Sequence, residues 1–316
     1  MLNNQDFALS RASCLGGSDI GAVLGVSPYR SAVDVWMEKT GRVSGVCDSL
    51  ALRFGSFAES FIASEYELAT GLALVAHDAA VVHPQYAYLM GHIDRFVCSG
   101  PLFDAAGSLL ASRVLECKTA NVYTQSEWGE VGTDQVPLSY LVQCLWYLML
   151  TGLEQADLAV LFGNSDFRIY EIHRDWELEQ MLLDRAVSFW EKHVLEDRAP
   201  APKTESDFRT LFPKSVCKQV EAPLETCELI KKLKSINRQI ESYEQEVSQI
   251  KQSIMAQMQE AETLTYQGKV LATWKAPKPS FRLDGKRLEL EHPGITSNYK
   301  IQVQNSRRLM VKQIND

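Results

Sequence analysis

Residues 113–118 read Arg-Val-Leu-Glu-Cys-Lys, an apolar pair followed by an acid and a base two positions apart. The segment has the composition of a β-strand, and side chains two apart on a strand point to the same face. Glu116 and Lys118 therefore share one face, while the Cys117 side chain points to the other and is expected in the core. The alternative is an exposed strand with an incidental ion pair, which is less expected directly after two apolar residues.

A second acid, Asp94, lies 22 residues before Glu116 on a strand predicted over residues 89–98. If the two strands are neighbours, both carboxylates converge at one edge of a sheet. Together with the backbone carbonyl of Cys117 they offer only hard oxygen ligands, which suit Mg²⁺ or Mn²⁺ rather than zinc. The ammonium of Lys118 beside them would offset the charge of a phosphate. The set predicts metal-assisted hydrolysis of a phosphodiester.

The surrounding segments predict an α+β fold, a mixed sheet flanked by helices. Apolar residues at helical spacing predict longer helices over residues 32–40, 50–70, 137–150 and 176–196. Alternating or short apolar runs predict strands over residues 79–83, 89–98, 113–118, 158–162 and 167–172. The turn Gly163-Asn164-Ser165-Asp166 predicts a hairpin between the last two strands.

An amide interrupts the apolar helix predicted over residues 137–150. Gln143 lies four residues before Tyr147, so both side chains occupy one face of this buried helix. A buried amide without a hydrogen bond is costly. Gln143 is therefore either a functional residue or a satisfied amide of the core.

A glycine-rich turn opens a short helix near the N-terminus, in Gly16-Gly17-Ser18-Asp19. Ser18 or Asp19 is the predicted N-cap of this helix. The free backbone N–H groups of such a turn can bind an anion. The alternative is a plain N-cap, and Asp19 would repel a phosphate unless its side chain faces away.

The sequence after residue 205 differs in kind from the part before it. Eight apolar residues spaced alternately four and three apart predict a coiled coil or a helical hairpin: Leu229, Leu233, Ile236, Ile240, Tyr243, Val247, Ile250 and Ile254. Short β-like pieces are predicted around residues 267–268 and 284–285. We therefore divide the chain into a core (1–205), a linker with a helical arm (206–262) and a tail (263–316).

Charge is distributed unevenly along the chain. The whole chain carries −8, yet residues 265–316 hold 10 lysines and arginines against 4 acids. A basic tail of this kind is either a solvated extension or an arm that meets phosphates or an acidic partner.

Composition excludes several classes of protein. The 316 residues are 46% hydrophobic and 23% charged, which is typical of a globular protein. No apolar run approaches the roughly 20 residues of a membrane span, and the first residues lack the pattern of a signal peptide. The seven cysteines form no Cys-x-x-Cys or Cys-x-x-His pair, which argues against zinc or iron–sulfur sites. We expect a cytoplasmic protein with no membrane partner.

The combined motifs resemble a known superfamily. Asp94, Glu116-x-Lys118 and Gln143-x-x-x-Tyr147 resemble the PD-(D/E)XK nucleases. The fuller pattern, over roughly residues 10–200, resembles the YqaJ-like phage recombinase nucleases, relatives of lambda exonuclease. Its further elements are Gly16-Gly17-Ser18-Asp19-Ile20, Gly25-x-Ser27-Pro28-Tyr29, Phe54-Gly55-x-x-x-Glu59 and Gly91-x-x-Asp94.

The resemblance implies a restriction-endonuclease-like core and a role for each matching residue. Asp94 and Glu116 would be metal ligands, joined by the carbonyl of Cys117. Lys118 would assist the nucleophilic water. Glu59 would bind or orient a metal-bound water at a second ion.

Further positions match the family's supporting residues. Gln143 would position Lys118 or the nucleophile. Arg11 and Ser18 match the place where these exonucleases hold the 5′-phosphate. Tyr147 is a possible accessory residue. His92 shares a predicted strand face with Asp94 and could approach substrate, although a structural role is the alternative.

By resemblance, the protein is a Mg²⁺-dependent 5′→3′ exonuclease on linear double-stranded DNA, with two ions per site and Mn²⁺ as a substitute. It would leave 3′ single-stranded overhangs for a single-strand-annealing protein. It would act as a ring-shaped homotrimer, encoded by a phage or prophage, in the cytoplasm of a bacterial host. One alternative is a structure-specific or restriction-like endonuclease with the same core. Another is a non-enzymatic DNA scaffold that works through residues 226–316.

Overall fold

The computed structural model describes residues 12–43, 49–301 and 307–311, and the chain forms two compact units, 1–212 and 213–316. The first unit extends beyond residue 205, the predicted end of the core, because it includes helix α7 (Glu205–Leu211). The carboxylate of Asp207 in α7 accepts a hydrogen bond from the Ser31 hydroxyl at 2.5 Å. This bond joins α7 to the N-terminal part of the unit.

A five-stranded mixed sheet is the centre of the first unit. Its order is β1-β4-β5-β6-β7, formed by Leu74–Val75, Arg95–Val97, Arg113–Ala120, Gln155–Phe162 and Asp166–His173. β5 and β6 are parallel, and the other neighbours are antiparallel. The predicted hairpin is β6–β7, and Gly163 takes the left-handed conformation (φ 61°) in its turn. The predicted α+β class is confirmed.

The single strand predicted over residues 89–98 is wrong. The chain forms β3 (Met90–Gly91), which pairs with β2 (Val81–Val82) in a separate two-stranded sheet, and then β4, which joins the main sheet. Residues 92–94 lie between β3 and β4, where the chain passes from one sheet to the other. Asp94 therefore occupies a bend, and the strand face that it was predicted to share with His92 does not exist.

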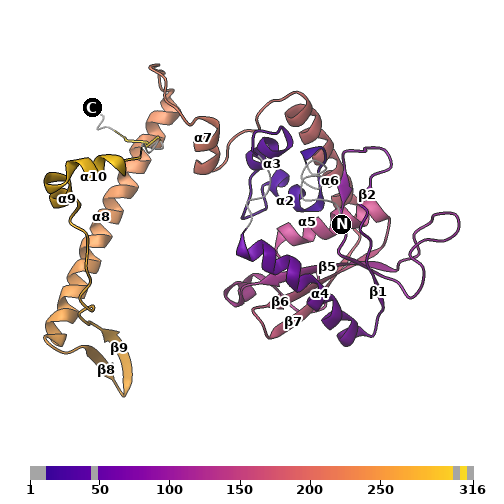
Figure 1. The fold of residues 1–316 in the computed structure, drawn as a ribbon, viewed down its shortest axis with the longest axis horizontal. Helices are drawn as coiled ribbons and strands as arrows, with labels where there is room; N and C mark the ends of the chain where they lie inside the picture. The colour runs from indigo at the N-terminus through magenta and orange to yellow at the C-terminus, as the bar shows by residue number, and fades with distance from the viewer. Residues whose placement is uncertain (1–11, 44–48, 302–306, 312–316) are drawn as a thin grey trace. The chain divides into compact units, whose positions relative to one another are not determined.

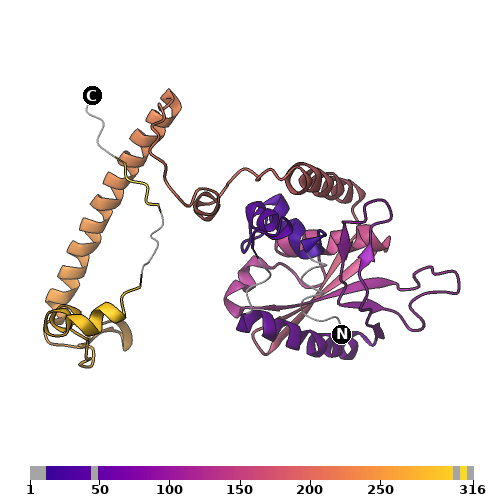
Figure 2. The same ribbon diagram turned by 45° about the horizontal axis from the view of Figure 1, so that its top comes forward.

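Helices cover both faces of the main sheet. They are α2 (Gly17–Leu24), α3 (Ala32–Lys39), α4 (Leu50–Thr70), α5 (Leu138–Thr151) and α6 (Trp176–Phe189), which continues as a π-helical turn, η2 (Trp190–Leu195). A 3₁₀ turn, η1 (Val122–Glu127), follows β5. Figures 1 and 2 show α4 on one side of the sheet and the other helices on the opposite side.

Alternation along β5 assigns each side chain to one of these layers. Leu115 and Cys117 are buried in a cluster with Ala58 and Ile62 of α4. Glu116 lies on the opposite face, which α5 covers. The face assignment made from the spacing of residues along this strand is therefore confirmed, including the core position of Cys117.

The second unit contains the long helix α8 (Leu224–Met258), followed by the hairpin β8–β9 (Thr263–Tyr266 and Lys269–Thr273). The β-like piece predicted around residues 284–285 is wrong, because Asp284 accepts a hydrogen bond from the Arg287 N–H and caps helix α9 (Gly285–Glu291). A short helix, α10 (Pro293–Asn298), comes next. Among the described residues, none of the helices is long and apolar enough to cross a membrane.

Candidate active site

Three residues singled out from the sequence come together where β4 and β5 pair. Asp94 lies directly before β4, and its Oδ2 accepts a hydrogen bond from the Cys117 N–H in β5 at 2.8 Å. Glu116 and Lys118 share one face of β5, with the Lys118 Nζ 2.5 Å from the Glu116 Oε1. Antiparallel pairing thus gathers two carboxylates and an ammonium at one place.

Gln143 contacts this cluster from α5, the helix that covers the Glu116 face of the sheet. Its Nε2 donates to the Glu116 Oε1 at 2.6 Å and to the Tyr147 hydroxyl oxygen at 2.9 Å. Gln143 is therefore a hydrogen-bonded amide that orients a carboxylate. The resemblance implied that it positions Lys118 or the nucleophile, whereas its hydrogen bonds in the structure go to Glu116 and Tyr147.

Two glycines make room for the Tyr147 ring. A Cβ atom at Gly91 would lie 2.9 Å from the ring carbons, and one at Gly17 would lie 2.7 Å from them. Both distances are closer than non-bonded carbons approach. The glycines of the motifs at residues 16–19 and 91–94 therefore permit the packing that supports Gln143 and, through it, Glu116.

The charges of the cluster shift one another's pKa values. Desolvation raises the pKa of Asp94 well above its ordinary range, and the nearby charge of Glu116 raises it further. Burial also raises the pKa of Glu116, against the opposing effect of Lys118. Burial by itself would lower the pKa of Lys118, but the charges of Glu116 and Asp94 outweigh burial and raise it. The two carboxyl groups thus oppose each other's ionisation, while their charges favour the protonated form of Lys118.

The donor set fits a hard divalent cation. Glu116 Oε2 is buried and has no hydrogen-bond partner among the described residues, so one oxygen of this carboxylate is left without a donor. Carboxylates suit Mg²⁺ or Mn²⁺. Within the described ranges, no group of three or more His, Cys, Asp or Glu side chains is gathered closely enough to hold a metal. Asp94 and Glu116 are two side chains of this cluster that could bind such an ion.

Glu59 is connected to this pair through Arg95, the residue that follows Asp94. It belongs to α4, on the face of the sheet opposite to Glu116, and its Oε1 is paired with Arg95 at 2.7 Å. Arg95 also donates to the backbone carbonyl of Asp94. The negative charge of Glu59 nevertheless contributes to the raised pKa values of Asp94 and Glu116. Glu59 is thus coupled to the cluster by its charge and by its ion pair with Arg95.

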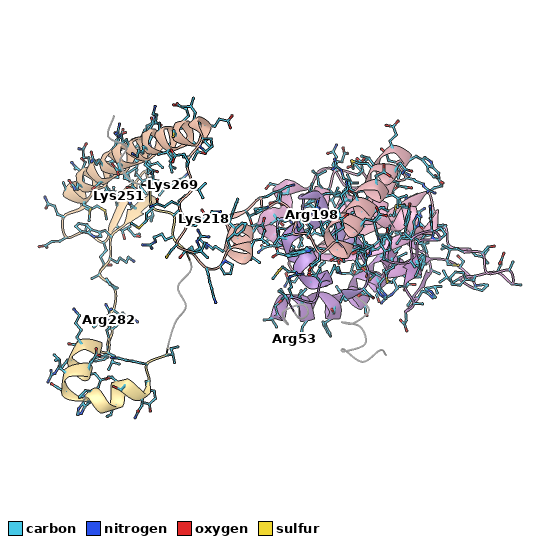
Figure 3. All side chains as sticks on the ribbon, turned by 90° about the horizontal axis from the view of Figure 1, so that it is seen from above. Arg53, Arg198, Lys218, Lys251, Lys269 and Arg282 are labelled. Carbon is cyan, nitrogen blue, oxygen red and sulfur yellow. The ribbon has the colours of Figure 1, made fainter. Side chains whose placement is uncertain are left out.

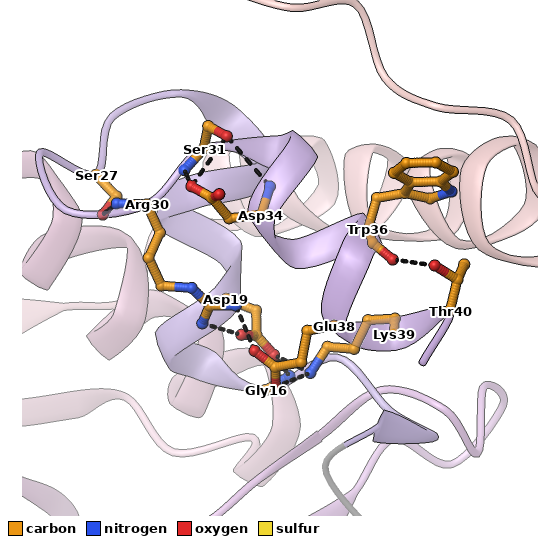
Figure 4. A network of polar contacts seen from close by, with 10 residues as sticks. All are labelled: Gly16, Asp19, Ser27, Arg30, Ser31, Asp34, Trp36, Glu38, Lys39 and Thr40. Carbon is orange, nitrogen blue, oxygen red and sulfur yellow. Dashed lines mark hydrogen bonds and ion pairs between the residues drawn. The ribbon is translucent and has the colours of Figure 1, made fainter. Parts of the chain in front are cut away.

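The Asp19 side chain is buried and does not face the solvent. A phosphate site at this turn would require this, because an exposed carboxylate would repel the phosphate. The Asp19 carboxylate accepts a hydrogen bond from the Gly16 N–H at 3.1 Å and pairs with Arg30 at 3.0 Å and with the buried Lys39 at 2.8 Å (Figure 4). Arg30 also pairs with Glu38 at 2.6 Å. This network fixes α2 against α3, so the role of Asp19 is structural.

The turn before α2 differs in detail from the prediction. The N-cap is Gly16, not Ser18 or Asp19, because the Asp19 side chain reaches back to the Gly16 N–H. Ser18 is exposed in the first turn of the helix. Arg11, the other predicted phosphate ligand, lies outside the described residues.

Tyr140 is a neighbour of the cluster that sequence reasoning missed. The Lys118 Nζ lies 5.7 Å from the centre of its ring, and the ring stacks on Trp128 at 5.3 Å. A signal was available: Tyr140 lies three residues before Gln143 on the same face of α5.

Two solved structures share a distant likeness with this chain. An alkaline exonuclease from Laribacter hongkongensis is 15% identical, with a TM-score of 0.48, over 61% of this chain and 94% of that one. A phage-related exonuclease from Haemophilus somnus 129PT is 13% identical, with a TM-score of 0.42, over 58% and 96%. The fold class above rests on the sheet order and layers of this chain, not on these likenesses.

Sequence comparison is more specific. A protein of Bacillus subtilis (strain 168), described as "Uncharacterized protein YqaJ", is 29% identical over 321 aligned positions, which cover 99% of this chain and 95% of that protein. Residues 6–154 match the YqaJ-like viral recombinase domain. These matches confirm the predicted resemblance, and residues 6–154 of this chain are similar to the YqaJ-like viral recombinase domain.

Proposed function

We propose that this chain is a nuclease that hydrolyses linear double-stranded DNA from its 5′ ends and leaves 3′ single-stranded overhangs. The observation that carries the proposal is the meeting of Asp94, Glu116 and Lys118, with Glu116 Oε2 buried and lacking a hydrogen-bond partner among the described residues. A buried carboxylate oxygen without a donor favours a further ligand at Oε2, and a divalent cation would fill this place. We propose DNA as the substrate because the chain is similar to the YqaJ-like recombinases.

The residues divide the work of phosphodiester hydrolysis. Water adds to phosphorus, the bond to the 3′-oxygen of the terminal nucleotide breaks, and that oxygen takes up a proton. Lys118 holds the water and offsets the charge that develops on the phosphate. Gln143 and Tyr147 fix the Glu116 carboxylate in one orientation.

Asp94, Glu116 and the backbone carbonyl of Cys117 would hold the metal, which we propose to be Mg²⁺, or Mn²⁺ in its place, with two ions per site. A bound divalent ion supplies Lewis-acid polarisation of the phosphate and a lowered pKa of water. Glu59 would contribute to a second ion through water. His92, exposed beside Asp94, would serve as an accessory group.

The remaining parts of the proposal concern substrate and assembly. Ser18, exposed at the start of α2, and Arg11 would hold the 5′-phosphate of the shortened strand. The overhang would pass to a single-strand-annealing protein. A ring of three subunits would enclose the duplex, which gives processivity without tight binding.

The test uses one DNA sequence in two forms, a linear duplex with 5′-phosphates and a label on each strand end, and a covalently closed circle. Both are incubated with Mg²⁺ and the full chain, with Glu116→Gln as the inactive variant. Glu130→Gln, at an exposed site outside the cluster, is the matched control. We expect loss of the 5′-terminal nucleotides from the linear form only, abolished by Glu116→Gln and unaffected by Glu130→Gln.

Other outcomes assign other functions. Cleavage of the circle would establish an endonuclease with the same core and would remove the need for a 5′-phosphate site. Binding of both forms without cleavage would contradict the nuclease and leave a DNA scaffold.

A further inference from the structure

The eight heptad residues of α8 form an exposed apolar stripe along one side of the helix. Their side chains are between 38% and 66% exposed, although each is aliphatic or aromatic: Leu229, Leu233, Ile236, Ile240, Tyr243, Val247, Ile250 and Ile254. The stripe runs for about 38 Å at the 1.5 Å rise of an α-helix. Exposed apolar surface of this extent marks an interaction site.

The seven-residue repeat of the stripe indicates which kind of surface it can pack against. An α-helix has 3.6 residues per turn, so a strict seven-residue repeat stays on one side only when the helix supercoils around another helix. The other described helices of the second unit, α9 and α10, have seven and six residues and are too short to cover it. The partner of matching length and period is the same helix of another copy.

The surface already has the shape that a coiled coil uses. A groove on α8 is lined by Ile240, Tyr243, Glu244 and Val247, with Ser248 and Lys251 at its edge. In heptad positions, these first four residues are a, d, e and the next a. Four residues of this kind form the hole that receives one side chain of a facing helix.

Charge complementarity selects the orientation. With Leu233 at position a, Glu246 is at position g and Lys251 is at the following position e. In a parallel, in-register pair, Glu246 of each copy lies beside Lys251 of the other. In an antiparallel pair overlapping the whole stripe, Lys251 would instead face the apolar Ile230. Figure 3 labels Lys251 on α8.

We propose that α8 binds the α8 helices of other copies of this chain in a parallel, in-register coiled coil. Isoleucine fills two of the four d positions and β-branched residues fill three of the four a positions, a core composition that favours three strands over two. The proposal is independent of the nuclease activity, since no residue of α8 belongs to the Asp94–Glu116–Lys118 cluster.

The first test is a charge reversal in the full chain. Lys251→Glu places acids side by side in the parallel assembly, and we expect about tenfold weaker self-association by sedimentation analysis. Adding Glu246→Lys restores opposite charges and should restore the association. Lys234→Glu makes the same change on the outer side of α8 and is the matched control. Failure of the double variant to recover would overturn the parallel arrangement.

The second test reports on α8 even if the first unit also self-associates. The two native thiols of the second unit are removed with Cys217→Ser and Cys227→Ser, and Val247→Cys is then introduced at an a position. We expect rapid disulfide formation between copies. Gln245→Cys, on the outer side, should form little. Equal yields at the two positions, or none at position 247, would overturn the proposal.

Light scattering on the unmodified chain gives the number of copies, for which we expect three. A mass of one chain at micromolar concentration would overturn self-association, and a mass of two would overturn the strand number. Glu116→Gln should assemble like the unmodified chain whether or not the nuclease proposal holds. Failure of the assembly is therefore distinguishable from failure of the catalysis.

Discussion

The two oxygens of Glu116 have different surroundings. Oε1 forms an ion pair with Lys118 and accepts a hydrogen bond from Gln143. Oε2 is buried with no hydrogen-bond donor among the described residues. A buried acceptor left without a partner costs about 1–3 kcal/mol. Glu116 therefore lowers the stability of the metal-free chain, and residues that lower stability in this way are typical of functional sites.

Glu116→Gln should separate stability from activity. A neutral amide removes the burial cost that raises the pKa of Glu116, so we expect the unfolding free energy in metal-free buffer to rise by about 1 kcal/mol. Hydrolysis should fall by more than the roughly 10- to 100-fold seen for residues that only orient a metal ligand. Urea unfolding and DNA digestion measure the two effects. A less stable and fully active variant would contradict the assignment.

The raised pKa values of Asp94 and Glu116 predict a pH dependence of stability. Between the ordinary pKa of 4.5 for a glutamate and the raised value, the native state holds more protons than the unfolded state. The unfolding free energy of the metal-free chain should therefore fall as pH rises through this window. Urea titrations over this range should show a shallower slope for Glu116→Gln. An identical slope would place the titrating groups elsewhere.

At the scale of elements, α5 is the part that joins the motifs. Tyr147 lies between the turn before α2 and the end of β3, and Trp146 donates to the Met90 carbonyl at 3.0 Å. The glycines of two motifs, Gly17 and Gly91, meet the same tyrosine ring. These glycines are thus explained by the packing of one side chain, without any contact to substrate.

Gly91→Ala should destabilise the first unit through Tyr147. A Cβ atom 2.9 Å from the ring forces a shift in a packed core, which costs about 1–3 kcal/mol. In a Tyr147→Leu background the same substitution should cost much less, and a double-mutant cycle from urea unfolding gives the difference. Gly100→Ala, with open space around its Cβ position, is the control. Equal costs in both backgrounds would exclude the Tyr147 contact as the cause.

At the scale of the whole molecule, basic residues are concentrated in the last part of an acidic chain. In the second unit, the acids Glu289 and Glu291 are already paired, with Lys300 and Arg287 respectively. Lys275, Lys278 and Arg282 have no ion-pair partner within the described ranges, and Arg282 projects from an extended segment (Figure 3). Exposed aromatic residues, Trp274 and Phe281, adjoin them. Cations beside aromatic rings favour nucleic acid.

Replacing Lys275, Lys278 and Arg282 with glutamine should weaken DNA binding by the Glu116→Gln chain. Each lost phosphate contact lowers the salt dependence of log Kd by about 0.9 on duplex DNA. We therefore expect the slope to fall by about 2–3, measured by fluorescence anisotropy at several salt concentrations. The control changes three basic residues of α8 to glutamine: Lys231, Lys234 and Arg238. It lowers the net charge by the same amount and should leave the slope nearly unchanged. An unchanged slope in the tail variant would indicate an acidic protein partner instead.

The sequence alone determined the elements whose pattern is local. The helix over residues 50–70, the hairpin at Gly163 and the alternation along β5 each depend on neighbours a few positions apart, so periodicity and turn residues suffice to predict them. The heptad stripe of α8 is of the same kind. Glu116 and Lys118 were assigned to one face by spacing, and Asp94 was joined to them by the expectation that two neighbouring strands meet.

Tertiary structure decided what depends on distant parts of the chain. The strand over residues 89–98 breaks at 92–94 because β3 and β4 pair with different partners. Glu59 pairs with Arg95 because α4 packs on the face of the sheet opposite to α5, beside the start of β4. Gln143 binds Glu116 because α5 crosses above that residue. These arrangements depend on packing between segments far apart in the chain. The pattern of residues along the sequence does not show which of these surfaces come into contact.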